Sequence, residues 1–312
     1  MRREPPPLPS APGVQPQNAP AKPARIAADA WPRHTLHAER VWQLNLPGGA
    51  RFDASALLEL PDGTLLTLAD RGPTLFRIEF APGANTANLV EVPDRFTPEQ
   101  LAPYAARKTG RYDSEGLARD EAGRIYLCEE ADRWILRWDP QTRAVERLGI
   151  DWTPVQRFFS VDRNASFEGV AVGGGRLYAA NERSVGRIIV VELATLAVVE
   201  DFSVKPMGIT AHDVHYSDLC WFEGTLFCLL RESRKVLGVE PATHRVLVEF
   251  DYSDLERDPE YAYFNLYPSG LMEGLAVDNE FIWLVTDNNG MGRVRYPRDT
   301  RPTLFRCRRP DR

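Results

Sequence analysis

The sequence predicts an all-β protein in which one antiparallel unit is repeated. Five segments of similar sequence recur along the chain, and their starts lie 59, 53, 50 and 55 residues apart. The segments are SALLELPDGTLLTLADRG from Ser55, SEGLARDEAGRIYLCEEAD from Ser114, FEGVAVGGGRLYAANERS from Phe167, SDLCWFEGTLFCLLRES from Ser217 and MEGLAVDNEFIWLVTDNNG from Met272. A fixed period of this length indicates repeated supersecondary units.

Each segment predicts a hairpin, because two apolar runs flank a turn containing Asp, Gly or Asn. A third strand is expected after each hairpin, at residues 75–80, 134–138, 187–192, 235–239 and 293–296, and usually a fourth, such as residues 245–250. Four antiparallel strands per repeat are typical of a β-propeller blade. We therefore expect five blades, with a sixth, degenerate blade as the alternative. Residues 35–46 and 303–307 should close the ring by pairing in one blade.

Residues 1–33 predict a tether ahead of a single domain at residues 34–312. This segment holds nine of the 25 prolines and seven alanines, and it has almost no large apolar side chain before Trp31. Such a composition cannot build a packed core. It also lacks the apolar stretch of a signal peptide, so the protein is either cytoplasmic or has lost its signal. The sequence contains no run of eighteen apolar residues, so it does not predict a membrane-spanning helix.

The charge distribution disfavours nucleic acid as a partner. The net charge is −6, but residues 1–33 carry +3 and residues 293–312 carry +6, which leaves −15 on the body. Polyanions are held by clustered Lys and Arg, which the body lacks. We expect a monomer with a small anionic or ester substrate. The four cysteines show neither a C-x-x-C pair nor zinc-site spacing, and they leave the redox compartment open.

Acidic residues recur at a fixed spacing in the repeats. Four repeats pair two acids 14 positions apart: Glu115 with Glu129, Glu168 with Glu182, Asp218 with Glu232, and Glu273 with Asp287; the first repeat pairs Ala56 with Asp70. Antiparallel geometry brings both members of a pair to one end of the hairpin. Since the first strand of a blade lines the channel, we expect a ring of carboxylates at one mouth. Converging carboxylates suit Ca²⁺ or Mg²⁺.

The same ring has a structural alternative, in which it is a salt-bridge network that joins the blades. Basic residues stand close to the acids, at Arg71, Arg133, Arg183, Arg231, Arg234 and Arg293. Guanidinium groups beside a metal would also suit an anionic substrate, and we select Arg71, Arg183 and Arg231 for that role. His215 is a candidate general base; the alternative is a loop histidine with ordinary hydrogen bonds. We expect the long connections at residues 93–113, 151–166, 205–216 and 252–271 to surround a cup-shaped depression above the ring. Their aromatic residues either line a pocket or fasten the loops to the domain.

Three of these strand starts, DSEGLA from Asp113, NASFEGVA from Asn164 and EGLA from Glu273, resemble those of the phytase-like esterase propellers of bacteria. The resemblance spans roughly residues 50 to 295. It implies a propeller that hydrolyses phosphate or other esters with calcium, with Glu115, Glu168, Glu273 and their paired acids facing the metal. It also implies export to the periplasm or cell envelope. Ala56 departs from the pattern, and the full cation-site signature of calcium phytases is missing, so phytate is not the expected substrate.

The function expected from the sequence is a metal-dependent hydrolase of a phosphate ester or other ester. The expected metal ligands are Asp70, Glu115, Glu129, Glu168, Asp218, Glu232, Glu273 and Asp287. Glu168, Glu182 and His215 are the expected catalytic residues, and the ion would activate a water molecule. The alternatives are a lactonase similar to gluconolactonase and a non-catalytic propeller that binds a ligand or a protein.

Overall fold

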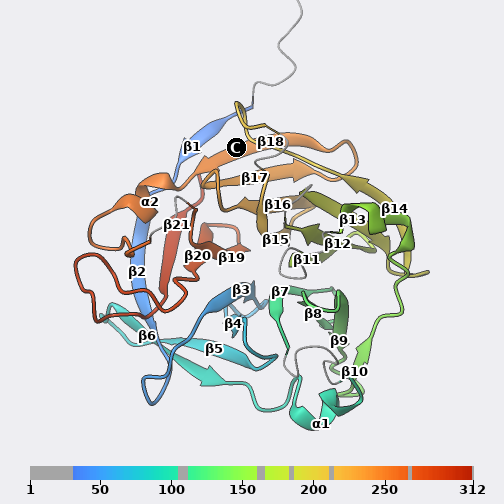
Figure 1. The fold of residues 1–312 in the computed structure, drawn as a ribbon, viewed down its shortest axis with the longest axis horizontal. Coiled ribbons are helices and arrows are strands. Elements are labelled where there is room, and N and C mark those ends of the chain that lie inside the picture. Colours follow the sequence, from blue (N-terminus) through green and yellow to red (C-terminus); the bar gives the residue numbers. More distant parts are fainter. Residues whose placement is uncertain are drawn as a thin grey trace, which may run out of the picture. The chain divides into compact units, whose positions relative to one another are not determined.

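Five four-stranded antiparallel sheets surround one axis in the part of the chain that the structure describes (Figure 1). The structure is a computed structural model, and it describes residues 31–104, 112–159, 166–182, 186–210, 214–265 and 269–310. These sheets are the five predicted blades of a β-propeller, and the described residues contain no sixth blade.

The blades follow one another along the chain, and each begins with its innermost strand. Blade 1 holds β3 (Ala54–Glu59), β4 (Leu65–Ala69), β5 (Leu75–Phe80) and β6 (Thr86–Glu91); blade 2 holds β7 (Ser114–Arg119), β8 (Ile125–Glu129), β9 (Trp134–Trp138) and β10 (Val145–Arg147). Blade 3 holds β11 (Phe167–Gly173), β12 (Arg176–Asn181), β13 (Arg187–Glu192) and β14 (Ala197–Phe202). Blade 4 holds β15 (Tyr216–Phe222), β16 (Thr225–Leu230), β17 (Lys235–Glu240) and β18 (Arg245–Asp251). Blade 5 holds β19 (Met272–Val277), β20 (Phe281–Thr286), β21 (Thr303–Arg308) and β2 (Ala38–Asn45).

The N-terminal strands close the ring. As predicted, β2 and β21 pair in one blade, and β2 also runs parallel to β6, so blades 5 and 1 form one continuous sheet. A further strand, β1 (Arg33–Thr35), lies parallel to β18 at the rim of blade 4. The sheet structure therefore begins at Arg33, one residue before the expected start of the domain. These two strands tie blades 4, 5 and 1 together (Figure 1).

The third strand of blade 5 differs from the expectation. Residues 293–296 form no strand, and only Arg293 makes an isolated bridge, to Tyr263. The third strand is instead β21, which the sequence analysis had assigned only to ring closure. Pro297 and Pro302 interrupt the region between, and proline cannot donate a ladder hydrogen bond. A long loop therefore connects β20, which ends at Thr286, to β21, which begins at Thr303.

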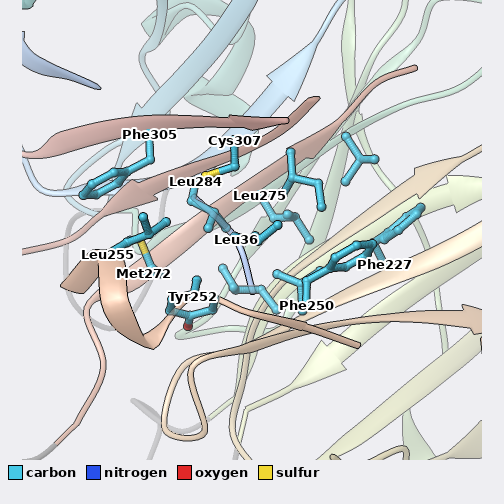
Figure 2. Close-up of a cluster of buried hydrophobic side chains, with 14 of the residues drawn as sticks. Leu36, Phe227, Phe250, Tyr252, Leu255, Met272, Leu275, Leu284, Phe305 and Cys307 are labelled. Carbon is cyan, nitrogen blue, oxygen red and sulfur yellow. The ribbon is translucent and has the colours of Figure 1, made fainter. Parts of the chain in front are cut away.

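Apolar clusters fill the spaces between blades. Figure 2 shows the cluster between blades 4 and 5, where Phe227 and Phe250 lie on one side, Leu275 and Leu284 in the middle and Phe305 on the far side. All five side chains are almost completely buried. The close packing of these buried side chains holds each blade against its neighbours and fixes the innermost strands around the axis.

Short loop helices lie outside the sheets: α1 (Pro98–Leu101), α2 (Ser253–Arg257) and the 3₁₀ turns Ala102–Tyr104 and Thr153–Phe158. The described loop aromatics fasten these loops down. The hydroxyl of Tyr112 donates to the carbonyl of Tyr104 at 2.5 Å, Tyr263 donates to the carbonyl of Arg301 at 2.5 Å, and Phe158 packs against the core of blade 3. Tyr267 lies outside the described residues. The structure thus favours the fastening role over a pocket lining for these side chains.

Every innermost strand carries a β-bulge near its start. Register shifts lie between Ala54 and Ala56, Ser114 and Gly116, Phe167 and Gly169, Tyr216 and Asp218, and Met272 and Gly274. The bulged residues are Ser55, Glu115, Glu168, Ser217 and Glu273. A bulge re-aims one side chain without breaking the ladder. In this ring it turns five equivalent side chains toward the same mouth of the channel.

The residue after the bulge is glycine in three blades because the neighbouring blade comes too close for a side chain. A Cβ on Gly169 would lie 2.7 Å from Cα of Asp218, and a Cβ on Gly274 would lie 2.7 Å from the carbonyl carbon of Ala56. Backbone atoms at that distance cannot move aside without separating two blades. These glycines therefore let the innermost strands meet around the axis.

We expect Gly169→Ala to lower the free energy of unfolding by about 3 kcal/mol, at the upper end of the cost of overpacking a core. Urea unfolding followed by tryptophan fluorescence measures the effect. Gly149→Ala is the matched control, because nothing lies within 4 Å of a Cβ at that position. An equal, small effect of both substitutions would contradict the close-approach explanation.

Candidate metal centre at the channel mouth

Two positions in each blade bring side chains to one mouth of the channel. The first is the bulged residue. The second is the residue that follows the second strand, namely Asp70, Glu130, Glu182, Arg231 and Asp287. In four blades the amide of this second residue donates to a carbonyl just before the first strand, as from Glu130 to Asp113 at 2.8 Å and from Glu182 to Ser166 at 2.7 Å. The hairpins therefore end in the same way, and their terminal side chains share one face of the ring.

Five carboxylates of blades 2 and 3 meet at this mouth. Oxygens of Asp113, Glu115 and Glu130 lie within 4.8 Å of one another, and so do oxygens of Glu130, Glu168 and Glu182. Glu130 belongs to both groups, and we call the five residues the acid cluster. Glu130, Glu168 and Glu182 are buried, whereas Asp113 and Glu115 are half-buried. The cluster thus has a closed inner side and an open outer side.

Burial and the charges of neighbouring carboxylates raise the pKa of two members of the cluster, Glu130 and Glu115. Burial, followed by the charges of Asp113 and Glu182, raises the pKa of Glu130 to about 8. Burial and the charge of Glu168 raise the pKa of Glu115 well above its ordinary value. A carboxyl that resists ionisation for these reasons becomes a strong ligand once a cation arrives, because the cation removes both penalties.

Arg231 occupies the ring position that is acidic in the other four blades. Its Nη2 lies 2.7 Å from Oε1 of Glu182, and its Nη1 pairs with Oε1 of Glu273. Burial alone would lower the pKa of Arg231, but the carboxylates of Glu168, Glu182 and Glu232 outweigh it and raise the pKa. One guanidinium therefore joins blade 3 to blade 5 across the channel mouth.

The predicted ligands Glu129 and Asp218 belong to neither carboxylate group of the acid cluster. Oε2 of Glu129 accepts from the amide of Asp132 at 2.8 Å, while Glu130 faces the mouth. Asp218 occupies the position after the bulge, and its carboxylate accepts from the amides of Leu219 and Leu275, both at 2.8 Å. It joins blades 4 and 5 at the axis. Burial raises the pKa of Asp218 well above its ordinary value despite these hydrogen bonds.

Glu232 and His215 form a separate pair on blade 4. Nδ1 of His215 lies 3.4 Å from Oε1 of Glu232, and this hydrogen bond lowers the pKa of Glu232. Nε of Arg231 lies 4.0 Å from the same carboxylate, so the pair borders the ring. His215 is thus within reach of the mouth without belonging to the acid cluster.

Blade 1 contributes a mixed group of acids and arginines. Nε of Arg71 lies 3.6 Å from Oδ1 of Asp70, and the buried carboxylate of Asp53 pairs with both Arg51 and Arg71. Burial, followed by the charges of Asp53 and Asp70, raises the pKa of Asp287 to about 7. The predicted ligands Asp70 and Asp287 therefore belong to this group, which lies beside the acid cluster. Arg183 lies outside the described residues.

The sequence pattern did not indicate Asp113, Glu130, Arg51 or Asp53. The 14-residue spacing led to Glu129 because the hairpin of blade 2 is one residue longer than that of blade 3, and it led to Glu232 because it was counted from Asp218 and not from the bulged residue Ser217. In strand register Ser114 pairs with Glu129, so the residue that turns into the mouth is the next one, Glu130. The adjacent acids Glu129 and Glu130 were the available signal, because one of the two had to face the channel.

The acid cluster fits a divalent cation by its donor chemistry. Five carboxylates from two blades supply hard oxygen ligands, which suit Ca²⁺. Glu273 lies outside this cluster: its Oε1 pairs with Arg231, and its buried Oε2 has no hydrogen-bond partner among the described residues.

The opposite mouth has a different character. It opens into a cavity of about 370 Å³ that is lined mainly by apolar residues of the five innermost strands, with Glu59 and Asp278 at its edge. Burial, followed by the charge of Asp278, raises the pKa of Glu59 to about 7. The two ends of the channel therefore differ, with acids and arginines gathered at one end and mainly apolar residues at the other.

The raised pKa of Glu59 predicts a pH effect on stability. The protonated carboxyl stabilises the fold below about pH 4.5, and this contribution is lost as the pH rises toward 7. Glu59→Gln removes the titration, so we expect the variant to be more stable than the wild type by about 1–2 kcal/mol at pH 8, after allowance for solvent screening, and equally stable at pH 4.5. Urea unfolding at the two pH values measures this difference, with exposed Glu79→Gln as control. A constant difference at both pH values would contradict the assignment.

Fold and site together define a five-bladed propeller with an acidic axial mouth. The chain belongs to the phytase-like family, described as esterase-like activity of phytase, whose profile matches residues 53–290. A search of curated proteins finds no match to the chain.

One solved structure shares the fold, and two others match more weakly. Glutaminyl cyclase of Myxococcus xanthus is 17% identical, with a TM-score of 0.58 over 89% of this chain and 98% of that one. A virginiamycin B lyase of Staphylococcus aureus has a TM-score of 0.42 at 11% identity, covering 81% of this chain and 66% of that one. The WD40 repeats of RRP9 have a TM-score of 0.44 at 12% identity, covering 88% and 100%. In the described part of the chain, no helix has the length and apolar character needed to cross a bilayer.

Proposed function

We propose that this protein is a Ca²⁺-dependent hydrolase that cleaves an ester at the acidic mouth of the channel. The observation that carries the proposal is Glu130, which belongs to two carboxylate groups at once. Asp113, Glu115, Glu130 and Glu168 would hold the ion. Ca²⁺ accepts six to eight oxygens in flexible arrangements, whereas Mg²⁺ demands a small octahedral shell, so we propose that Mg²⁺ binds more weakly.

A bound ion would polarise the ester carbonyl or phosphoryl oxygen and lower the pKa of a water molecule. Glu182 is the best-placed general base, because Arg231 holds its Oε1 at 2.7 Å and so orients the carboxylate. The pair of His215 and Glu232 at the border of the ring is the proposed proton donor to the leaving group. Arg71, Arg183 and Arg231 remain the proposed contacts to an anionic substrate.

We further propose a monomer that acts in the periplasm or cell envelope of a bacterium, where calcium sites of modest affinity are filled. Light scattering coupled to gel filtration gives the mass in solution. Fractionation of cells that express the full-length gene product gives its compartment.

Melting curves in Ca²⁺, Mg²⁺ and EDTA test the metal, and hydrolysis assays test the reaction. We expect Ca²⁺ to raise the melting temperature by several degrees and to support turnover of p-nitrophenyl phosphate or p-nitrophenyl acetate. Turnover of a lactone alone would favour the lactonase. Stabilisation by Ca²⁺ without any turnover would favour a binding protein, and melting that is insensitive to both Ca²⁺ and EDTA would overturn the proposal.

A further inference from the structure

We propose that Arg51 and Arg71, both anchored on Asp53, form a subsite for an oxyanion beside the acid cluster. Asp53 is only 2% exposed and lies directly before β3. Nε of Arg51 lies 2.6 Å from Oδ2 of Asp53, and Nε of Arg71 lies 3.7 Å from the same oxygen. One buried carboxylate thus positions two guanidinium groups next to each other.

The outer nitrogens of both arginines face solvent. The side chains of Arg51 and Arg71 are 41% and 51% exposed, and no Nη atom of either has an acceptor among the described residues. Gly290 leaves room for Arg51, since a Cβ there would lie 2.9 Å from its Nε. A guanidinium held through Nε presents its Nη donors in a planar fork, which matches the oxygens of phosphate or carboxylate.

Backbone contacts place this pair next to the acid cluster. The amide of Asp70 donates to the carbonyl of Asp53 at 3.1 Å, and the amide of Ser114 donates to the carbonyl of Asp70 at 3.0 Å. Ser114 lies between the cluster residues Asp113 and Glu115. The two guanidinium groups therefore stand one blade away from the proposed metal, at the same mouth.

The acids around the pair restrict what binds there. The negative charges of Asp70 and Asp287 also act on Arg51. They oppose the non-specific binding of anions at this place. An oxyanion that accepts several directed hydrogen bonds from the two guanidinium groups gains more binding free energy than non-specific charge attraction provides. The role of this subsite in turnover rests on the proposed function: the substrate would be an ester with a second, anionic group, phosphate or carboxylate. Binding of the oxyanion itself does not depend on hydrolysis.

Isothermal titration of the EDTA-treated full-length protein with inorganic phosphate, and separately with benzoate, tests the subsite. We expect Arg51→Gln and Arg71→Gln each to weaken binding of the preferred anion at least tenfold. Arg124→Gln is the matched control, because Nε of Arg124 lies 2.6 Å from a carboxylate oxygen of Asp120 in the hairpin turn of blade 2, at the opposite mouth. Far-UV circular dichroism and the melting temperature confirm folding, and Arg71→Gln, whose contact to Asp53 is longer, serves if Arg51→Gln unfolds.

The outcomes separate this inference from the proposed function. Unchanged anion affinity in both variants, no measurable binding of either anion to the wild type, or an equal loss in Arg124→Gln would overturn the subsite. Loss of anion binding in the two arginine variants, with intact stabilisation by Ca²⁺, supports the subsite. The subsite also stands if Ca²⁺ does not stabilise the wild type, because that result overturns only the proposed hydrolase. For an active enzyme we expect Arg51→Gln and Arg71→Gln to raise the KM tenfold for 4-acetoxybenzoate, an ester with a separate carboxylate, and to leave the KM for p-nitrophenyl acetate unchanged; equal changes for both esters would contradict a role in substrate selection.

Discussion

Replacing Glu130 with glutamine should abolish stabilisation by Ca²⁺. Glutamine keeps the shape of the side chain and can still accept the amide of Ser166, which donates to Oε1 of Glu130 at 2.9 Å. It removes the charge that both carboxylate groups share. For the wild type, Ca²⁺ at about one hundred times its Kd stabilises by about 2.7 kcal/mol, and differential scanning calorimetry with and without Ca²⁺ should show this increment only for the wild type.

The same substitution should stabilise the metal-free protein at alkaline pH. The pKa of Glu130 is raised to about 8, so the wild type loses the stability of the protonated carboxyl as the pH rises from about 4.5 to 8. The variant does not titrate, and we expect it to exceed the metal-free wild type by about 2–4 kcal/mol at pH 8.

Glu129→Gln is the matched control, since Glu129 is also buried and burial raises its pKa to about 7, yet it lies outside the acid cluster. It should retain the full Ca²⁺ effect. Equal Ca²⁺ responses of the two variants would show that the ion binds elsewhere.

Replacing Arg231 with glutamine should destabilise the metal-free protein by about 3–5 kcal/mol at pH 8, because it removes the cation between Glu182 and Glu273. Breaking a buried ion pair on one side leaves an uncompensated charge, which costs this much. Urea unfolding measures the loss. Arg231→Lys should show a smaller loss, since it keeps the charge but not the fork that reaches both carboxylates.

Ca²⁺ should restore part of the stability of Arg231→Gln, because the vacated position is again surrounded by carboxylates. Arg187→Gln is the control: Arg187 pairs with Asp201 in blade 3, outside the channel mouth. Its loss should be smaller and should not respond to Ca²⁺. If Ca²⁺ rescued both variants equally, Arg231 would have no special role in the charge balance of the mouth.

The sequence predicted the acidic mouth better than it predicted which carboxylates lie together there. Glu115, Glu168 and Glu182 lie in the acid cluster because a hairpin of known length must return its ends to the same side of the ring. Ser55 was aligned with Ser114 on the shared serine, but strand register pairs Ala54 with Ala69 as it pairs Ser114 with Glu129. Ser55 is therefore the counterpart of Glu115, and its hydroxyl donates to the carbonyl of Ser114 at 2.6 Å.

Local patterns in the sequence by themselves determined the repeat, the hairpins, the propeller architecture and the end of the channel at which acids gather, because period-two alternation and turn residues act over a few residues. Only the tertiary structure decided which acid of an adjacent pair faces the channel, that Asp218 binds backbone amides, and that Arg231 spans two blades. One residue more or less in a hairpin changes which of two adjacent acids faces the channel, because in a strand one residue reverses the direction of a side chain. Contacts between blades, such as those of Asp218 and Arg231, also cannot be predicted from local patterns, because they depend on how closely the five blades approach the common axis.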